Sequence, residues 1–203
     1  MALIANPDQA FNQLLSRLEL DATRVDKAST RYNAIKSTIE NALPGCKVTQ
    51  IGSFQRKTKI RSAALAGRLD IDAVVNLGRV QDFTDAFLPS DALKLVRRAL
   101  NQNKVYFGMN PKLDAPTVSM KYADNTKVEL VPALSFDVAD RSTPRCYIVG
   151  ANNRSWMYAD YDHDAAWITA GNQESDGMLV PSIKIVKALL RYRQIPLKSF
   201  HIE

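Results

Sequence analysis

Hydrophobic residues recur at helical spacing near both ends of the chain and once in its middle. In the first such segment, Phe11, Leu14 and Leu18 repeat at intervals of three and four residues, and Pro7 stands at the first helical position. The same periodicity, read with its capping residues and stop signals, predicts five helices, over Asn6–Leu20, Asp21 to about Leu43, Pro89–Asn101, Asp160 to about Gln173 and Pro181–Tyr192.

The middle of the chain carries short apolar and β-branched runs bounded by glycine, proline or asparagine. These runs predict strands over Lys47–Ile51, Leu69–Leu77, Thr117–Tyr122, Lys127–Val131 and about Ser135–Val138. Asp124-Asn125 predicts the turn of a hairpin between the third and fourth strands. The expected fold class is therefore α+β, with N-terminal helices, a mixed sheet, and C-terminal helices that close over it.

Composition and charge narrow the class of protein without deciding it. The 203 residues are 46% hydrophobic and 24% charged, as in a globular domain, and no apolar run approaches the length of a membrane span. The N-terminus lacks the pattern of a secretory signal, so we expect a cytoplasmic protein with no membrane partner. Cys46 and Cys146 stand far from any Cys/His cluster, which excludes a structural zinc site. The formal net charge of +6 permits a polyanionic ligand.

Two aspartates occupy the strand predicted at Leu69–Leu77. Aspartate is depleted in strands, and Asp70 and Asp72 lie on the same face because side chains alternate along a strand. One interpretation is an edge strand with a solvated acidic face. The apolar Val74-Val75 that follows favours an interior strand instead, and a further carboxylate, Glu129, lies on the strand Lys127–Val131.

Three carboxylates from two neighbouring strands suit a pair of magnesium ions. Two such ions, about 3.5–4 Å apart, stabilise the attacking and leaving oxygens of an in-line phosphoryl displacement. A turn at Gly52-Ser53 follows the first predicted strand, where a backbone without Cβ can approach a phosphate closely. The β region is therefore the expected place for chemistry.

These motifs resemble those of nucleotidyltransferases of the DNA polymerase β superfamily. The residues concerned are GSFQRKTKIR at Gly52–Arg61, LDIDAVV at Leu69–Val75 and VELVPAL at Val128–Leu134. With SIKIVKALL at Ser182–Leu190 and PLKSFHIE at Pro196–Glu203, the chain looks most like the bacterial cyclic-oligonucleotide synthases, or CD-NTases. Those enzymes are relatives of cyclic GMP–AMP synthase and oligoadenylate synthetase, and they act in anti-phage signalling. At Lys57 the family often has glycine.

The resemblance implies a role for each matching residue. Asp70, Asp72 and Glu129 would be catalytic and would bind two Mg²⁺ ions, for which Mn²⁺ can substitute. Gly52 and Ser53 would contact the donor triphosphate. Lys187 would pair with phosphate, and Ser199 would lie near the base-binding pocket.

The resemblance also implies a domain division. Residues 1–150 would form the nucleotidyltransferase core with its N-terminal helices, and 151–203 the start of a C-terminal helical lobe. Relatives usually continue beyond the segment that matches the end of this chain. Either the native protein is longer, or the lobe is truncated.

Three functions follow, and the sequence leaves them open. The first is an Mg²⁺-dependent enzyme that joins nucleoside triphosphates into a cyclic or short linear oligonucleotide messenger and releases pyrophosphate. The second is a template-independent transferase that acts on an RNA end or a small molecule. The third is a catalytically silent module that binds nucleotide or nucleic acid on the same fold. Nucleoside triphosphates are the expected partners, with room for a regulatory protein or nucleic-acid ligand.

Two groups of basic residues could serve either phosphate binding or surface charge. One group follows the Gly-Ser turn and comprises Arg56, Lys57, Lys59 and Arg61. The other shares one face of the last helix and comprises Lys184, Lys187 and Arg191.

Overall fold

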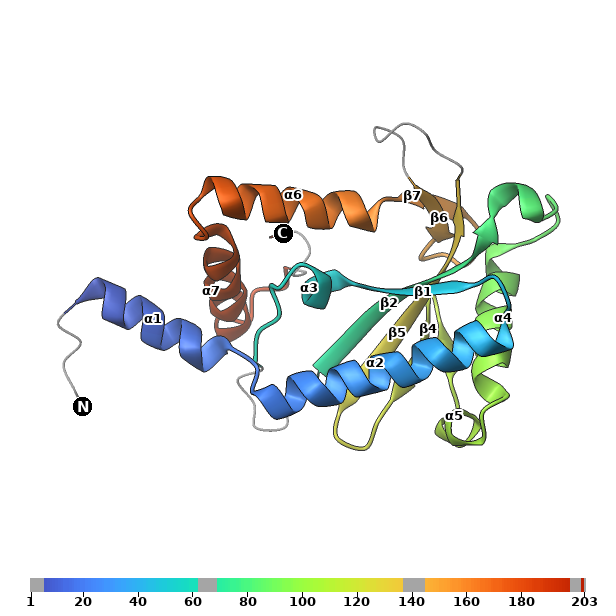
Figure 1. Ribbon diagram of the computed structural model, residues 1–203, viewed down its shortest axis with the longest axis horizontal. Coiled ribbons are helices and arrows are strands. Elements are labelled where there is room, and N and C mark those ends of the chain that lie inside the picture. The colour runs from blue at the N-terminus through green and yellow to red at the C-terminus, as the bar shows by residue number, and fades with distance from the viewer. Residues whose placement is uncertain (1–5, 62–68, 137–144, 198–201, 203) are drawn as a thin grey trace.

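A seven-stranded mixed sheet organises the part of the chain that the computed structural model describes, residues 6–61, 69–136, 145–197 and 202 (Figure 1). Its strands are β1 (Lys47–Ile51), β2 (Leu69–Arg79), β3 (Lys112–Asp114), β4 (Thr117–Lys121), β5 (Thr126–Ser135), β6 (Cys146–Val149) and β7 (Trp156–Ala159). The order is β1-β2-β5-β4-β3, with β6 beside the later part of β5 and β7 beside β6. The central strands β2 and β5 are parallel, and the other pairs are antiparallel.

Two helices, α2 (Ala22–Ala42) and α4 (Pro89–Asn101), cover one face of this sheet and close the hydrophobic core. Asp21 caps α2 by accepting a hydrogen bond from the Arg24 backbone N–H. The core residues of both helices are spaced by three, four or seven, so they form a single stripe toward the sheet. They are Ala28, Ile35 and Ile39 of α2, and Leu93, Val96 and Leu100 of α4.

Strand β2 alternates between this core and the opposite face. Leu69, Ile71, Ala73 and Val75 are buried, whereas the residues between them are only partly buried. Each large side chain buried in this way contributes about 1.5–3 kcal/mol to folding. The alternation fixes which face carries the remaining side chains of the strand, because a slip of one residue would expose the whole apolar row.

The remaining helices are shorter or lie toward the other end of the molecule. Here α1 (Pro7–Leu18) packs along α7 (Leu179–Tyr192), and α6 (Tyr161–Glu174) leads into α7 (Figure 1). One turn of helix, α3 (Gly52–Gln55), follows β1, and α5 (Lys104–Met109) follows α4. A 3₁₀ turn, Val80–Asp82, follows β2.

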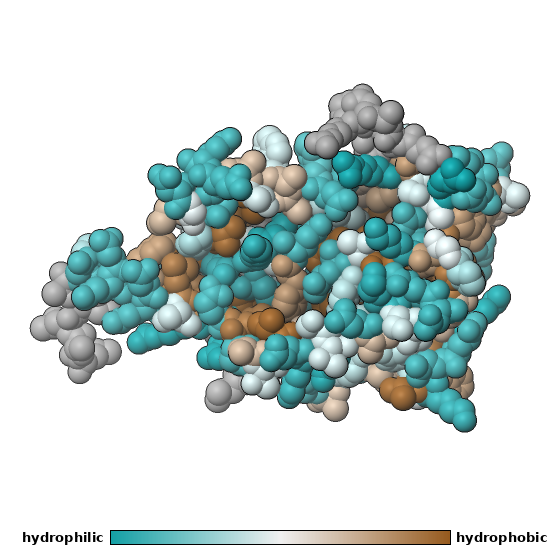
Figure 2. Space-filling model, in the orientation of Figure 1, coloured by the Kyte–Doolittle hydropathy of each residue, from teal (hydrophilic) through white to brown (hydrophobic). Residues whose placement is uncertain are grey.

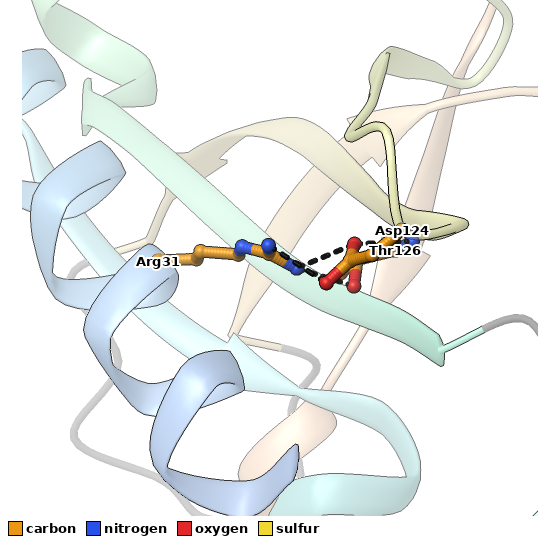
Figure 3. Close-up of polar contacts among 3 residues, drawn as sticks. All are labelled: Arg31, Asp124 and Thr126. Atoms are coloured by element: carbon orange, nitrogen blue, oxygen red, sulfur yellow. Dashed lines mark hydrogen bonds and ion pairs between the residues drawn. The ribbon is translucent and has the colours of Figure 1, made fainter. Parts of the chain in front are cut away.

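A polar clamp joins α2 to the hairpin between β4 and β5 (Figure 3). The Arg31 guanidinium donates to both carboxylate oxygens of Asp124, at 2.9 Å each, and to the Thr126 hydroxyl. It also lies over the Tyr122 ring, 4.1 Å from the ring centroid. Such a bidentate pair fixes orientation as well as distance, so the clamp ties the start of β5 to α2.

Seen in the orientation of Figure 1, the molecular surface is largely hydrophilic, and hydrophobic residues are visible mainly over the region of α7 (Figure 2). On α7 itself Val186, Leu189 and Tyr192 are exposed, Tyr192 by 80%. None of the described helices combines the length and the hydropathy that crossing a bilayer requires.

The five helices expected from the sequence are present, with ends that differ by a few residues. The strand carrying Asp70 and Asp72 lies between β1 and β5, so the edge-strand interpretation is wrong. The two strands expected at Lys127–Val131 and about Ser135–Val138 were also wrong in part, because β5 runs unbroken from Thr126 to Ser135. Residues 137 and 138 lie outside the described part of the chain.

Several short elements were not expected from the sequence, namely α5, β3, β6 and β7. The last of these strands, Trp156–Ala159, extends the sheet into the segment that we expected to begin the helical lobe. The helices of that segment, α6 and α7, follow it directly.

Candidate active site

The three carboxylates singled out by the sequence lie on the sheet face opposite α2 and α4. Asp72 and Glu129 are direct partners in the parallel pairing of β2 with β5, and Asp70 is one step away on the same face of β2. All three line a cavity of about 200 Å³, together with Gly52 and Ser53. Lys187 lines the same cavity, so the structure brings six of the seven predicted site residues to one place.

The Asp72 carboxyl lies in an environment that disfavours its ionised form. Burial raises its pKa to about 6, and the nearby carboxylates of Glu129 and Asp70 add to the rise. Lys59 and Arg56 act in the opposite direction, because their positive charges favour the ionised form. A carboxylate held among like charges in a partly desolvated site is a common feature of cation-binding and catalytic centres.

Gly52 allows the backbone after β1 to lie close to the Asp72 carboxylate. Its φ of +72° lies in the left-handed region that favours glycine. A Cβ at this position would lie 2.6 Å from Asp72 Oδ2, so any side chain would displace the carboxylate or the backbone. The Gly-Ser turn therefore needs glycine, because the backbone that follows β1 lies close to the Asp72 carboxylate of β2.

The loop after this turn is held by the last helix. Lys187 of α7 is only 2% exposed, and its Nζ donates to Thr58 at 3.0 Å from Oγ1 and 3.3 Å from the carbonyl oxygen. Burial lowers the pKa of Lys187 to about 7, and the positive charges of Arg56, Arg191, Lys59 and Lys184 lower it further. Several basic groups thus lie near one another around Lys187, an arrangement that favours an anionic ligand, and a bound anion would raise the pKa of Lys187 again.

The two basic groups divide according to whether they reach the cavity. Arg56, Lys59, Lys187 and Arg191 line it together with the carboxylates. Lys59 also donates to the Asp70 backbone carbonyl at 2.8 Å.

The other members of these groups lie elsewhere. Lys184 pairs with Glu19 at 2.6 Å, and Arg61 pairs with Asp21 at 3.1 Å. Lys57 is exposed. Its φ of +58° is the backbone conformation that suits the glycine often found there in the resembled family, so the loop keeps that shape with lysine in place.

Glu129 has a cationic neighbour that sequence reasoning missed. Lys127 Nζ lies 2.6 Å from Glu129 Oε1 and 3.4 Å from Asp114 Oδ2. The available signal was the spacing, because residues two apart on a strand share a face. Among the described residues, no three His, Cys, Asp or Glu side chains already converge as a finished metal cluster.

A larger cavity, of about 910 Å³, opens beside two of these carboxylates, Asp72 and Glu129. It shares Gly52, Arg56, Asp72 and Glu129 with the smaller one, and its far wall comes from β6, β7 and α6. Tyr158 and Trp167 lie on that wall and are 62% and 75% exposed. The site therefore joins a small charged compartment to a wide compartment with aromatic side chains. Ser199, the remaining predicted site residue, lies outside the described residues.

A family model supplies the decisive comparison. Residues 6–172 match the Second Messenger Oligonucleotide or Dinucleotide Synthetase domain, which covers the sheet, Gly52 and all three carboxylates. The chain belongs to this family. Its members are nucleotidyltransferases of the DNA polymerase β type, which confirms the resemblance found in the sequence. A search of curated proteins gives no match.

Solved structures of bacterial CD-NTases share the fold. Escherichia coli MS115-1 CdnC, solved with ATP, superposes with a TM-score of 0.70 at 17% identity over 96% of this chain and 62% of its own. Elizabethkingia meningoseptica CdnE, a cyclic dinucleotide synthase solved with GTP and Apcpp, gives 0.73 at 13% identity over 97% and 73%. Vibrio cholerae DncV, a cyclic AMP-GMP synthase, gives 0.70 at 13% identity over 86% and 62%.

These neighbours confirm the expected fold, and they are longer than this chain. The chain spans about three fifths of the length of CdnC and of DncV.

Proposed function

We propose that this protein is an Mg²⁺-dependent nucleotidyltransferase that joins nucleoside triphosphates into a cyclic or short linear oligonucleotide messenger. The observation that carries the proposal is that Asp70, Asp72 and Glu129 line one cavity together with the basic side chains of Arg56, Lys59, Lys187 and Arg191. A metal-bound triphosphate requires both kinds of group, carboxylates for the metal and cations for the phosphates. The neighbouring wide cavity offers room for a second nucleotide.

The donor set supports a hard divalent cation. Three carboxylates supply only oxygen ligands, which suit Mg²⁺ or Mn²⁺ better than softer metals. Because Gly52 has no side chain, its backbone lies close to Asp72 without filling the space beside Oδ2. The residues therefore fit the two metal ions that the resemblance implies, with Asp70, Asp72 and Glu129 as their ligands.

When bound, divalent cations at these carboxylates would lower the pKa of the attacking hydroxyl and offset the charge that develops on the leaving pyrophosphate. The chain's own groups position the reactants. Lys187, Arg191 and Arg56 would hold the triphosphate, and the Gly52-Ser53 turn would bring its backbone close to the phosphates. The new bond joins the hydroxyl oxygen to the α-phosphorus as the bond to pyrophosphate breaks.

The partners follow from the same site. Nucleoside triphosphates are the proposed substrates, as CdnC and CdnE were solved with ATP and with GTP and Apcpp. A regulatory protein is a further candidate, since CdnC was also solved in complex with a HORMA protein. The proposed setting is anti-phage signalling, in keeping with the resemblance to CD-NTases.

The product distinguishes the proposed function from its two alternatives. The purified protein is incubated with all four α-labelled nucleoside triphosphates and Mg²⁺, with and without added RNA, and then with phosphatase. A labelled product that phosphatase leaves unchanged, with no terminal phosphate to remove, supports cyclisation, and labelled oligomers that lose terminal phosphates to phosphatase support a linear product. Label found only on the added RNA would indicate the template-independent transferase. Binding of ATP without any product would indicate the silent module.

A further inference from the structure

Lys127 is the one basic side chain on β5 that contacts a predicted metal ligand. Its Nζ lies 2.6 Å from Glu129 Oε1, and both side chains are largely buried, with 13% and 24% of their surfaces exposed. A charge-assisted hydrogen bond of this length in a partly dry site is a strong contact. Lys127 is therefore fixed against the carboxylate.

The sheet register places Lys127 inside the carboxylate cluster. In the parallel pairing of β2 with β5, Lys127 faces Asp70 and Glu129 faces Asp72. Four charged side chains, three acidic and one basic, thus occupy two adjacent rungs on the same face. The ammonium offsets the charge of Glu129, which is one of the two carboxylates that raise the pKa of Asp72.

An ammonium and a divalent cation cannot both hold the same oxygen at low cost. A Mg²⁺ ion binds carboxylate oxygen at about 2.0–2.1 Å, so an ion on Glu129 Oε1 would lie within about 5 Å of Nζ at its present position. Like charges at that spacing repel strongly in a poorly solvated site. Asp114 Oδ2, 3.4 Å from Nζ and on the edge strand β3, offers the ammonium a second acceptor.

We propose that Lys127 is a resident counter-ion of the carboxylate cluster, which holds Glu129 until a divalent cation displaces the ammonium toward Asp114. Lys127 then sets the concentration of divalent cation at which the site fills, and it is a positioning residue for Glu129. The proposal rests on the proposed function, because it takes Asp70, Asp72 and Glu129 as the metal ligands.

The test is a titration of the protein with Mn²⁺ alone. Binding is measured as the loss of the electron paramagnetic resonance signal of free Mn²⁺. Lys127→Met removes the competing charge and should lower the dissociation constant for Mn²⁺ at least five-fold. Lys127→Gln, a second neutral variant, should do the same, and Lys127→Arg should stay within two-fold of the unchanged protein. Circular dichroism melting verifies that each variant is folded.

Lys121→Met is the matched control for a general effect of charge. Lys121 is the partner of Lys127 across β4 and β5, it is exposed, and it forms no ion pair with any residue that the structure describes. Its loss should change the dissociation constant less than two-fold. The role of Lys127 would be overturned if Lys127→Met and Lys121→Met bound Mn²⁺ more tightly by the same factor. It would also be overturned if neither Lys127→Met nor Lys127→Gln bound Mn²⁺ more tightly than the unchanged protein. Binding of Mn²⁺ that Asp72→Asn does not weaken, or no binding at all, would overturn the metal site itself and the proposal with it.

Discussion

At the scale of single residues, Gly52 links the backbone of β1 to the chemistry of β2. Substitution by alanine forces a side chain into the left-handed region, at about 1–2 kcal/mol, and places its Cβ 2.6 Å from Asp72 Oδ2. Gly52→Ala should therefore lower nucleotidyl transfer roughly ten-fold or more while the protein stays folded. Pyrophosphate release and urea unfolding measure the two effects.

Gly45 provides the matched control for this change. Its φ is +85°, but a Cβ there would meet nothing within 4 Å. Gly45→Ala should lose a similar free energy of unfolding and keep its activity. An equal loss of activity in both variants would show that Gly52 acts through stability alone.

Asp72 should make the stability of the metal-free protein depend on pH in an unusual direction. Its folded pKa, about 6, lies above the ordinary value of 3.8, so the folded state binds more protons than the unfolded state between these values. The contribution of Asp72 to stability is therefore present below about pH 4 and is lost as the pH rises through about 6. Asp72→Asn, measured in a chelator, should be more stable than the unchanged protein at pH 7.5, by at most about 3 kcal/mol.

The difference between the two proteins should shrink toward pH 4.5, because Asp72 is then protonated in the folded state. Asp26→Asn, on the exposed part of α2, controls for loss of a negative charge and should show little difference at either pH. A difference for Asp72→Asn that is independent of pH would contradict the assigned environment.

At the scale of elements, α7 contributes one lysine, Lys187, to the cavity and another, the buried Lys184, to an ion pair with Glu19. If Lys187 holds the triphosphate, Lys187→Met loses a charge-assisted contact worth about 1.5–3 kcal/mol, or roughly ten- to a hundred-fold in affinity. Lys184→Met, one turn earlier, removes the same charge from a pair with Glu19 outside the cavity. Calorimetric titration with ATP and Mg²⁺ should show at least a five-fold loss in the first variant and less than two-fold in the second.

A merely structural role for Lys187, limited to its bonds with Thr58, predicts a different result. The melting temperature of Lys187→Met would then fall while its affinity for ATP stayed within two-fold of the unchanged protein.

The clamp between α2 and the β4–β5 hairpin should stabilise the fold away from the active site. Arg31→Met removes the bidentate contact with Asp124, and we expect a loss of about 1–2 kcal/mol, discounted because Asp124 is 42% exposed. The hydrogen bonds from Arg31 lower the pKa of Asp124 below its ordinary value of 3.8. The pair of Arg31 and Asp124 therefore stabilises the folded state above about pH 3.8, and this contribution to stability is lost as the pH falls below that value. Urea unfolding at pH 7 and pH 3 measures this, and a double-mutant cycle with Asp124→Asn isolates the pair.

The same elements show what a sequence can and cannot predict. Alternation along β2 placed Asp70 and Asp72 on one face, because the intervening residues were uniformly apolar. In β5 we expected a strand to end at Val131, but the strand continues through Pro132, which lies between Leu130, the last residue paired with β4, and Ala133, the first paired with β6. Proline is tolerated there because the ladder on that side is interrupted. Strands β6 and β7 have four residues each, too few for a periodic signal.

The sequence could not predict which basic side chains line the cavity, for a different reason. Helical spacing places Lys184, Lys187 and Arg191 on one face of α7, but it does not say which of them meets a neighbour and which meets the cavity. That choice depends on how α7 packs against the loop at Thr58, which is a tertiary contact between distant parts of the chain. Lys127 stands two residues before Glu129 on the same strand face, but the spacing alone does not show that its ammonium contacts the carboxylate.

At the scale of the whole molecule, the sheet and α7 together enclose the charged cavity within a chain that spans about three fifths of CdnC. The family membership covers residues 6–172, and α7, which supplies Lys187 and Arg191, lies beyond them. The proposed triphosphate site therefore depends on both the matched domain and the helix that follows it.

The most direct test of the central claim is the release of pyrophosphate from a mixture of the four nucleoside triphosphates. We predict release that requires Mg²⁺ or Mn²⁺ and falls by roughly a hundred-fold or more in Asp72→Asn, with that variant still folded. A folded protein that binds nucleotide with Mg²⁺ but releases no pyrophosphate, or an Asp72→Asn variant as active as the unchanged protein, would contradict the assignment of this site to nucleotidyl transfer.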